Sequence, residues 1–139
     1  FIPVEILQKP EALEPAETRY ILRHPLDSGR MLRAEFGEAV AETAMNHHER
    51  LDGSGYPRGL TSEDIGLPAR IIAVADAFDA MTTFRGYNRV KTFEEAAEEL
   101  CGLEEIFDGA VAETLRQLVN NGTIKKEEKE ETEPDEQTR

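Results

Sequence analysis

The sequence predicts an all-α fold, and three observations carry this prediction. Apolar residues recur at helical spacing in several segments, residues that favour helix ends stand at the segment boundaries, and no segment alternates apolar and polar residues as strands do. The 139 residues, 39% of them hydrophobic, are enough for one domain with a core or for part of one. We expect a helical domain over residues 1–122 and an acidic tail over residues 123–139.

The first half of the chain is expected to hold a short apolar turn and three helical segments. The turn covers residues 2–7, and the helical segments cover residues 15–24, 26–36 and 38–50. Pro15 fits the first turn of a helix. Pro25 disfavours the helical conformation of the residue before it, so a break or kink is predicted at His24. Gly37 separates the second segment from the third.

The third helical segment places two adjacent histidines on its apolar side. At about 100° per residue, one side carries Val40, Ala41, Ala44, His47 and His48. The opposite, polar side carries Glu38, Glu42, Asn46 and Glu49. An unpaired buried polar group costs ~1–3 kcal/mol, so the two imidazoles need partners. A metal ion, carboxylates or backbone carbonyls would all serve.

A glycine-rich loop and three further helices are expected in the second half. Residues 52–67 hold four glycines, Pro57 and few residues that could form a core, so they are predicted to be a loop. Pro68 fits the first turn of a helix with an apolar stripe of Ile71, Val74, Phe78 and Met81. Thr92 and Asp108 are expected to cap two shorter helices. The three helices are predicted over residues 68–81, 92–100 and 108–119.

The composition argues against several classes of function. The net charge of −13 disfavours broad contact with a nucleic-acid polymer, which needs a basic surface. No apolar run approaches the ~20 residues that span a bilayer, and no signal segment opens the chain. The single cysteine, Cys101, excludes an internal disulfide framework and favours a cytoplasmic location. Residues 125–136 are without apolar side chains, so the tail is expected to be disordered or a frayed helix.

Four residues are candidate metal ligands. They are the three histidines of the chain and one acid on the helix predicted over residues 68–81, namely His24, His47, His48 and Asp76. Imidazole and carboxylate together suit iron, manganese, zinc or nickel. Two of the four also have a simpler interpretation. His24 could bond the carbonyls at a helix end, and Asp76 could pair with Arg70 or Arg85.

The glycines of the predicted loop also have two interpretations. Gly53, Gly55 and Gly59 could permit tight turns. Alternatively, they could let backbone amides approach a phosphate or a guanine base, with Tyr56 as a stacking surface. The spacing of the glycines alone favours the turns.

The ordered run of these motifs resembles the HD-GYP family, a branch of the HD superfamily of all-α, metal-dependent phosphohydrolases. The resemblance covers roughly residues 1–118. Its upstream part rests on Ile2-Pro3-Val4-Glu5-Ile6-Leu7, Lys9-Pro10 and Arg23-His24-Pro25. Its specific part rests on His47-His48-Glu49, Asp52-Gly53-Ser54-Gly55-Tyr56-Pro57, Gly59-Leu60, Ile65, Ala69-Arg70-Ile71, Val74-Ala75-Asp76-Ala77-Phe78-Asp79-Ala80 and Arg85-Gly86-Tyr87.

The resemblance implies a helical bundle that hydrolyses cyclic di-GMP in the cytoplasm with a metal-activated water. It implies two or three divalent transition metals, with iron the first expectation and manganese the alternative. The implied metal ligands are His24, His47, His48 and Asp76. Arg85 is expected near a substrate phosphate, and Gly55, Tyr56 and Pro57 in substrate placement. Diguanylate cyclases (GGDEF proteins) are implied as possible partners, and a sensor or receiver domain is expected upstream.

One motif of the family is missing from this sequence. Members carry a His-Asp doublet just before the Ile-Pro segment, whereas no His-Asp dipeptide occurs here. We therefore expect the bundle to be incomplete at its N-terminal side and the 139-residue chain alone to be inactive. The intact ligands from His24 to Asp76 favour an enzyme. The missing doublet favours a non-catalytic module that senses the nucleotide or docks proteins. Another nucleotide hydrolase of the HD superfamily is disfavoured by the Gly-Tyr-Pro run.

Overall fold

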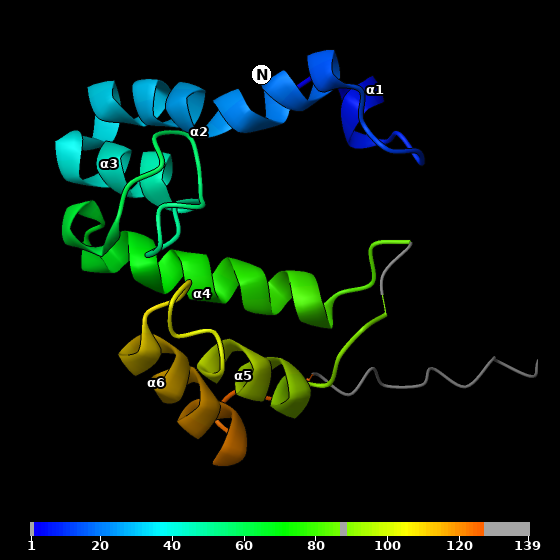
Figure 1. The fold of residues 1–139 in the computed structure, drawn as a ribbon, viewed down its shortest axis with the longest axis vertical. Coiled ribbons are helices and arrows are strands. Elements are labelled where there is room, and N and C mark those ends of the chain that lie inside the picture. The colour runs from blue at the N-terminus through cyan, green and yellow to red at the C-terminus, as the bar shows by residue number, and fades with distance from the viewer. Residues whose placement is uncertain (1, 87–88, 127–139) are drawn as a thin grey trace, which may run out of the picture.

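The computed structural model describes residues 2–86 and 89–126, and this part of the chain is helical (Figure 1). The α-helices are α1 (Val4–Leu7), α2 (Pro15–Phe36), α3 (Glu38–Asn46), α4 (Leu67–Thr82), α5 (Phe93–Cys101) and α6 (Gly109–Asn120). A 3-10 turn, η1, covers Ser62–Asp64. The described ranges contain no strand, only an isolated bridge between Asp52 and Thr61. The prediction of an all-α fold is therefore confirmed.

Helix α4 lies between two helix pairs, α2 with α3 on one side and α5 with α6 on the other (Figure 1). The main hydrophobic cluster lies on the α5–α6 side. Its buried members are Ala73, Val74, Leu100, Phe107 and Ala112. Helix α2 contributes only Pro25 and Gly29 to the buried residues. The two halves thus differ in how much apolar surface they bury.

Helix α2 runs through Pro25 as one continuous helix, so the predicted division into segments 15–24 and 26–36 is wrong. Proline lacks the N–H that would bond the carbonyl four residues earlier, which here belongs to Ile21. Nδ1 of His24 donates a hydrogen bond to this carbonyl instead. Pro25 is also fully buried, and its packing helps to offset the local preference against helix.

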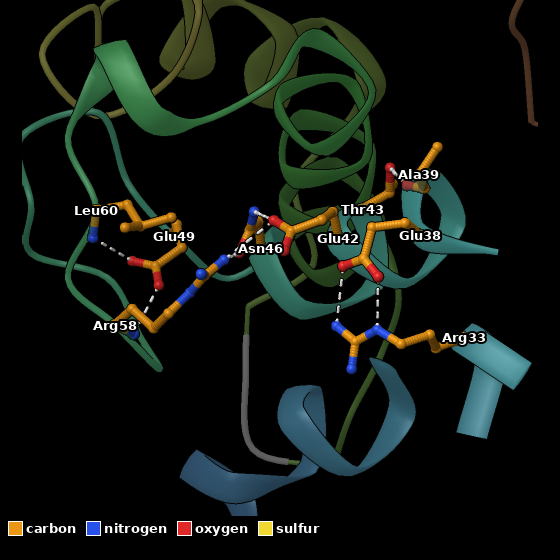
Figure 2. Close-up of polar contacts among 9 residues, drawn as sticks. All are labelled: Arg33, Glu38, Ala39, Glu42, Thr43, Asn46, Glu49, Arg58 and Leu60. Atoms are coloured by element: carbon orange, nitrogen blue, oxygen red, sulfur yellow. Dashed lines mark hydrogen bonds and ion pairs between the residues drawn. The ribbon is translucent and has the colours of Figure 1, made fainter. Parts of the chain in front are cut away.

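Helices α2 and α3 are joined by a tight connection at Gly37. This residue has φ +81°, a left-handed conformation that glycine adopts without strain. Arg33 closes the connection with two hydrogen bonds to Glu38, at 2.7 and 3.0 Å (Figure 2). Farther along, a Cβ at Gly29 would collide with the side chain of Met45, so the glycine lets α3 approach α2 closely. This packing sets α2 beside the end of α3.

The predicted extent and faces of the third helical segment need correction. Helix α3 ends at Asn46, with His47 as its C-cap, so the helical periodicity does not reach residues 48–50. Asn46 and Glu49, assigned to the polar side, are only 3% and 2% exposed. Val40, assigned to the apolar side, is 44% exposed. Asn46 and Glu49 are buried because residues 52–66, hereafter the 52–66 loop, fold back over residues 46–49.

The boundaries of the later helices follow the predicted caps. Thr92 forms a reciprocal capping box with Glu95 at the start of α5. Asp108 accepts a hydrogen bond from the Val111 amide, 3.1 Å away, at the start of α6. The apolar stripe predicted for α4 is only partly confirmed, because Val74 is buried whereas Ile71 is 48% exposed.

Among the described residues, no helix combines the length and the apolar composition that crossing a bilayer requires. Residues 123–126 are irregular, and the rest of the predicted acidic tail lies outside the described residues.

Candidate metal centre

Three histidines from two helices converge at the α2–α3 end of the molecule. His24 comes from the middle of α2, and His47 and His48 follow the last turn of α3. One potential ligand nitrogen from each ring lies within 4.8 Å of the others. The ring of His24 is 5.8 Å from that of His47 and 5.0 Å from that of His48, centroid to centroid. Residues 24 positions apart in the chain thus meet in one place, because α2 and α3 pack closely.

Two of the rings are oriented by main-chain carbonyls. His24 donates Nδ1–H to Ile21, and His47 donates Nδ1–H to the Ala44 carbonyl, 2.7 Å away. A carbonyl can only accept, so in both rings the neutral form keeps its lone pair on Nε2. Such carbonyl bonds on the outer nitrogen are typical of metal-ligating histidines, since they fix the tautomer and the ring. These two rings therefore fit a metal centre.

His48 lies against both His24 and Asp76. Its Nε2 is 3.2 Å from Nε2 of His24. Two nitrogens bound about 2.0–2.1 Å from one ion at a tetrahedral angle would be about 3.3–3.4 Å apart, so this separation fits ligands of one ion. Burial, with the neighbouring charges of His47 and His24, lowers the pKa of His48 to about 4. His48 is therefore neutral at neutral pH, the form that binds metal.

Asp76 lies beside the three histidines rather than among them. Its Oδ2 is 3.9 Å from Nδ1 of His48, and its side chain is 46% exposed. The arginines proposed as its alternative partners pair elsewhere: Arg70 with Asp108 at 3.1 Å, and Arg85 with Asp79 at 3.4 Å. Asp76 therefore faces the cluster from α4, while Arg85 lies beyond the end of that helix. Their roles as ligand and phosphate contact stay predictions.

The Gly55-Tyr56-Pro57 segment lies against His48. The Tyr56 ring stacks on the His48 ring, with centroids 4.9 Å apart and 21° between the planes. The Tyr56 amide donates to the His48 carbonyl at 3.3 Å. Burial raises the pKa of the Tyr56 hydroxyl, which is therefore neutral at neutral pH. A Cβ at Gly55 would lie 2.6 Å from Glu49 Cα, so this glycine serves close contact between two main-chain segments.

A polar network that the sequence did not reveal holds the loop in place (Figure 2). Glu49 accepts hydrogen bonds from the amides of Arg58 and Leu60, at 2.7 and 2.9 Å. Arg58 reaches back to Asn46 Oδ1 at 2.7 Å and to Glu42 at 3.2 Å. One signal was available: a long, glycine-rich loop has many amides that need acceptors, and a neighbouring carboxylate can serve two of them.

Comparison with known proteins agrees with this architecture. Residues 1–111 match the HD domain family. Over 114 residues the chain is 47% identical to 3′3′-cGAMP-specific phosphodiesterase 1 of Vibrio cholerae, covering 76% of this chain and 26% of that protein. Over 135 residues it is 39% identical to a cyclic di-GMP phosphodiesterase of Thermotoga maritima, covering 94% and 37%. The chain thus spans well under half the length of these curated relatives.

A solved structure shares the fold. A cyclic GMP-AMP-specific phosphodiesterase of Vibrio cholerae superposes with a TM-score of 0.61 at 24% identity, covering 88% of this chain and 32% of that one. The family match covers most of the sequence, and it agrees with the His-His-Glu and Gly-Tyr-Pro motifs on which the resemblance rested. The chain therefore belongs to the HD domain family, in its HD-GYP branch.

Proposed function

We propose that the protein containing this chain is a metal-dependent phosphodiesterase that hydrolyses cyclic di-GMP. The observation that carries the proposal is the three-histidine cluster, in which two rings keep their lone pair on Nε2 because their Nδ1–H groups bond carbonyls. The curated relatives support the reaction class, since they are named as phosphodiesterases of cyclic dinucleotides.

Each residue of the site has a role in this proposal. His24, His47 and His48 hold metal, and Asp76 adds a carboxylate ligand from α4. Bound divalent metals would activate a water for attack on phosphorus and neutralise charge on the phosphate. Gly55, Tyr56 and Pro57 place the substrate, with the Tyr56 ring as a stacking surface, and Arg85 pairs with a phosphate oxygen. Further ligands, a His-Asp doublet among them, would come from outside this sequence.

The identity of the metal and the cellular setting belong to the same proposal. Imidazole and carboxylate donors suit iron, manganese, zinc or nickel. The resemblance to the HD-GYP family favours iron first and manganese second, in a centre of two or three ions. The lack of any disulfide-capable cysteine pair supports a cytoplasmic location. Diguanylate cyclases are proposed as partners of the Gly55–Pro57 segment, and a sensor or receiver domain as the upstream input.

A second substrate has specific support. Hydrolysis of 3′3′-cGAMP is favoured by the relative at 47% identity, which is named for that substrate. A non-catalytic module that senses the nucleotide or docks proteins is the alternative that the turnover measurement below tests.

Metal analysis and nucleotide turnover on the complete protein test the proposal. We expect at least two transition-metal equivalents, faster hydrolysis of cyclic di-GMP than of 3′3′-cGAMP, and loss of hydrolysis in His47→Ala and in Asp76→Ala. Glu113→Ala on α6, remote from the cluster, is the control and should retain activity. Faster turnover of 3′3′-cGAMP would favour the second substrate. Nucleotide binding without turnover by the metal-loaded protein would favour the non-catalytic module.

A further inference from the structure

We infer that Glu49 is a positioning residue: its buried carboxylate holds the 52–66 loop so that the Tyr56 ring lies on the His48 ring. The effect on substrate placement rests on the proposed function, whereas the effect on the loop does not. Glu49 follows the two adjacent histidines directly, and it is 2% exposed. Burying a carboxylate costs free energy unless its oxygens accept hydrogen bonds. The donors that bond Glu49 therefore indicate its role.

Both oxygens of Glu49 are used by the same loop. Oε1 accepts the amide of Arg58 at 2.7 Å, and Oε2 accepts the amide of Leu60 at 2.9 Å (Figure 2). These two amides flank Gly59, so the carboxylate binds the main chain at two points of one short stretch. An ionised carboxylate accepts at every lone pair and donates at none, which suits two inward-pointing amides.

Main-chain hydrogen bonds on both sides of residues 58–60 also fix the loop to the segment around Glu49. The Tyr56 amide bonds the His48 carbonyl at 3.3 Å, and the Ser62 amide bonds the Leu51 carbonyl at 3.1 Å. Gly55 packs on the main chain of Glu49 so closely that it has no room for a Cβ. Glu49 therefore supports the loop twice, with its main chain beneath Gly55 and its side chain at residues 58–60.

This support reaches the metal centre through Tyr56. Residues 55–57 lie between the two attachment points, and the Tyr56 ring covers the His48 ring at 4.9 Å. The carbonyl bonds that orient His24 and His47 come from Ile21 and Ala44 and do not involve the loop. Loosening Glu49 should therefore move Tyr56 and the substrate surface while the metal-binding nitrogens of His24 and His47 stay in place.

Glu49→Gln in the complete, metal-loaded protein is the decisive variant. It keeps the volume but replaces one acceptor oxygen with an NH₂ group that faces an amide N–H. Since a hydrogen bond to a charged group is worth more than a factor of ten in an equilibrium, we expect KM for cyclic di-GMP to rise about tenfold or more. We expect kcat to change less than about threefold and the metal content to stay at the wild-type value, because the carbonyl-bonded histidines keep their orientation.

The matched control is Glu42→Gln. Glu42 lies on α3 and contacts Arg58, but through the guanidinium at 3.2 Å and with an exposed side chain. The Glu42→Gln variant should leave KM for cyclic di-GMP unchanged. Hydrogen exchange gives a second readout that does not need activity: amides of residues 58 and 60 should lose protection in Glu49→Gln and keep it in Glu42→Gln. If Glu49→Gln fails to fold, Glu49→Asp, which shortens the reach, takes its place in both measurements.

The outcomes separate the two proposals. If the wild-type protein hydrolyses no cyclic dinucleotide, the proposed function fails, and exchange at residues 58 and 60 alone decides the role of Glu49. Unchanged protection in the Glu49 variant would overturn the inference. So would a KM equal to the wild-type value, loss of metal together with activity, or equal effects of the two glutamine substitutions.

Discussion

The imidazole of His24 donates its Nδ1 hydrogen to the carbonyl of Ile21, the acceptor that Pro25 leaves without its usual helical partner. A proline inside α2 and a candidate ligand are thus parts of one arrangement. The proline frees a carbonyl, and the carbonyl fixes the histidine tautomer with Nε2 directed to the cluster.

Pro25→Ala should weaken metal binding without unfolding the helix. The new amide would compete with His24 for the Ile21 carbonyl, and loss of such an orienting bond typically lowers metal affinity by about tenfold or more. Titration of the metal-free protein with Mn²⁺ measures the change. Pro68→Ala, in the first turn of α4, is the control, since no histidine depends on it. Equal affinities in both variants would show that His24 does not need the proline.

Gly55→Ala should destabilise the protein because the added methyl group would overlap the main chain of residues 48–50. Overpacking of this kind costs about 1–3 kcal/mol. Gly109→Ala is the matched control. An added Cβ at Gly109, the first residue of α6, meets nothing within 4 Å, so that variant should change stability little. Denaturant unfolding compares the two, and a Gly55→Ala protein as stable as the wild type would contradict the close contact.

Arg58→Ala should destabilise the protein through Asn46. The Asn46 residue is 3% exposed, and its Oδ1 accepts from Arg58 at 2.7 Å, so the variant leaves a buried acceptor without its donor. Such a group costs about 1–3 kcal/mol. A double-mutant cycle with Asn46→Ala isolates the pair, and the second substitution should cost less when the first is present. Arg33→Ala, which breaks a pair on the surface, should change stability little. Additive effects of Arg58→Ala and Asn46→Ala would argue against the contact.

The stability of the α4–α6 junction should depend on pH through Asp108. Burial alone would raise its pKa, but hydrogen bonds from the Val111 amide and the Arg70 side chain lower it below the ordinary 3.8. A lowered folded-state pKa adds stability above the unfolded-state value, and this stability is lost as the pH falls through the folded-state pKa. Asp108→Asn should therefore lower Tm at pH 7, and the deficit should shrink below about pH 4. A deficit independent of pH would show that the charge of Asp108 does not matter.

The sequence predicted correctly those features that depend on residues within one helical turn. Thr92 and Asp108 mark helix starts because a side-chain oxygen can bond an amide within the same turn, and the fold keeps both caps. The histidine cluster was also predicted, because two adjacent histidines on the apolar side of one helical segment need partners and the chain holds a third histidine. The role of Asp76 as a metal ligand, expected from its residue type and implied by the family resemblance, stays a prediction.

The wrong predictions concern residues whose conformation or burial depends on contacts outside their own helical segment. Pro25 stays helical because of a histidine bond and burial, and Glu49 is buried because the 52–66 loop covers it. Neither effect can be read from helical periodicity, which treats each segment as if it faced only water or core. The Arg58–Asn46 bond joins residues 12 apart through a loop whose path the sequence does not specify.

The uneven distribution of buried side chains has a thermodynamic consequence. The cluster around Leu100 and Phe107 stabilises α4, α5 and α6 by burial, whereas α2 buries only a proline and a glycine. Metal binding should then supply part of the free energy that orders α2, so that metal binding and the folding of this helix form one linked equilibrium. Chelation would fray α2 first and leave the α4–α6 half structured.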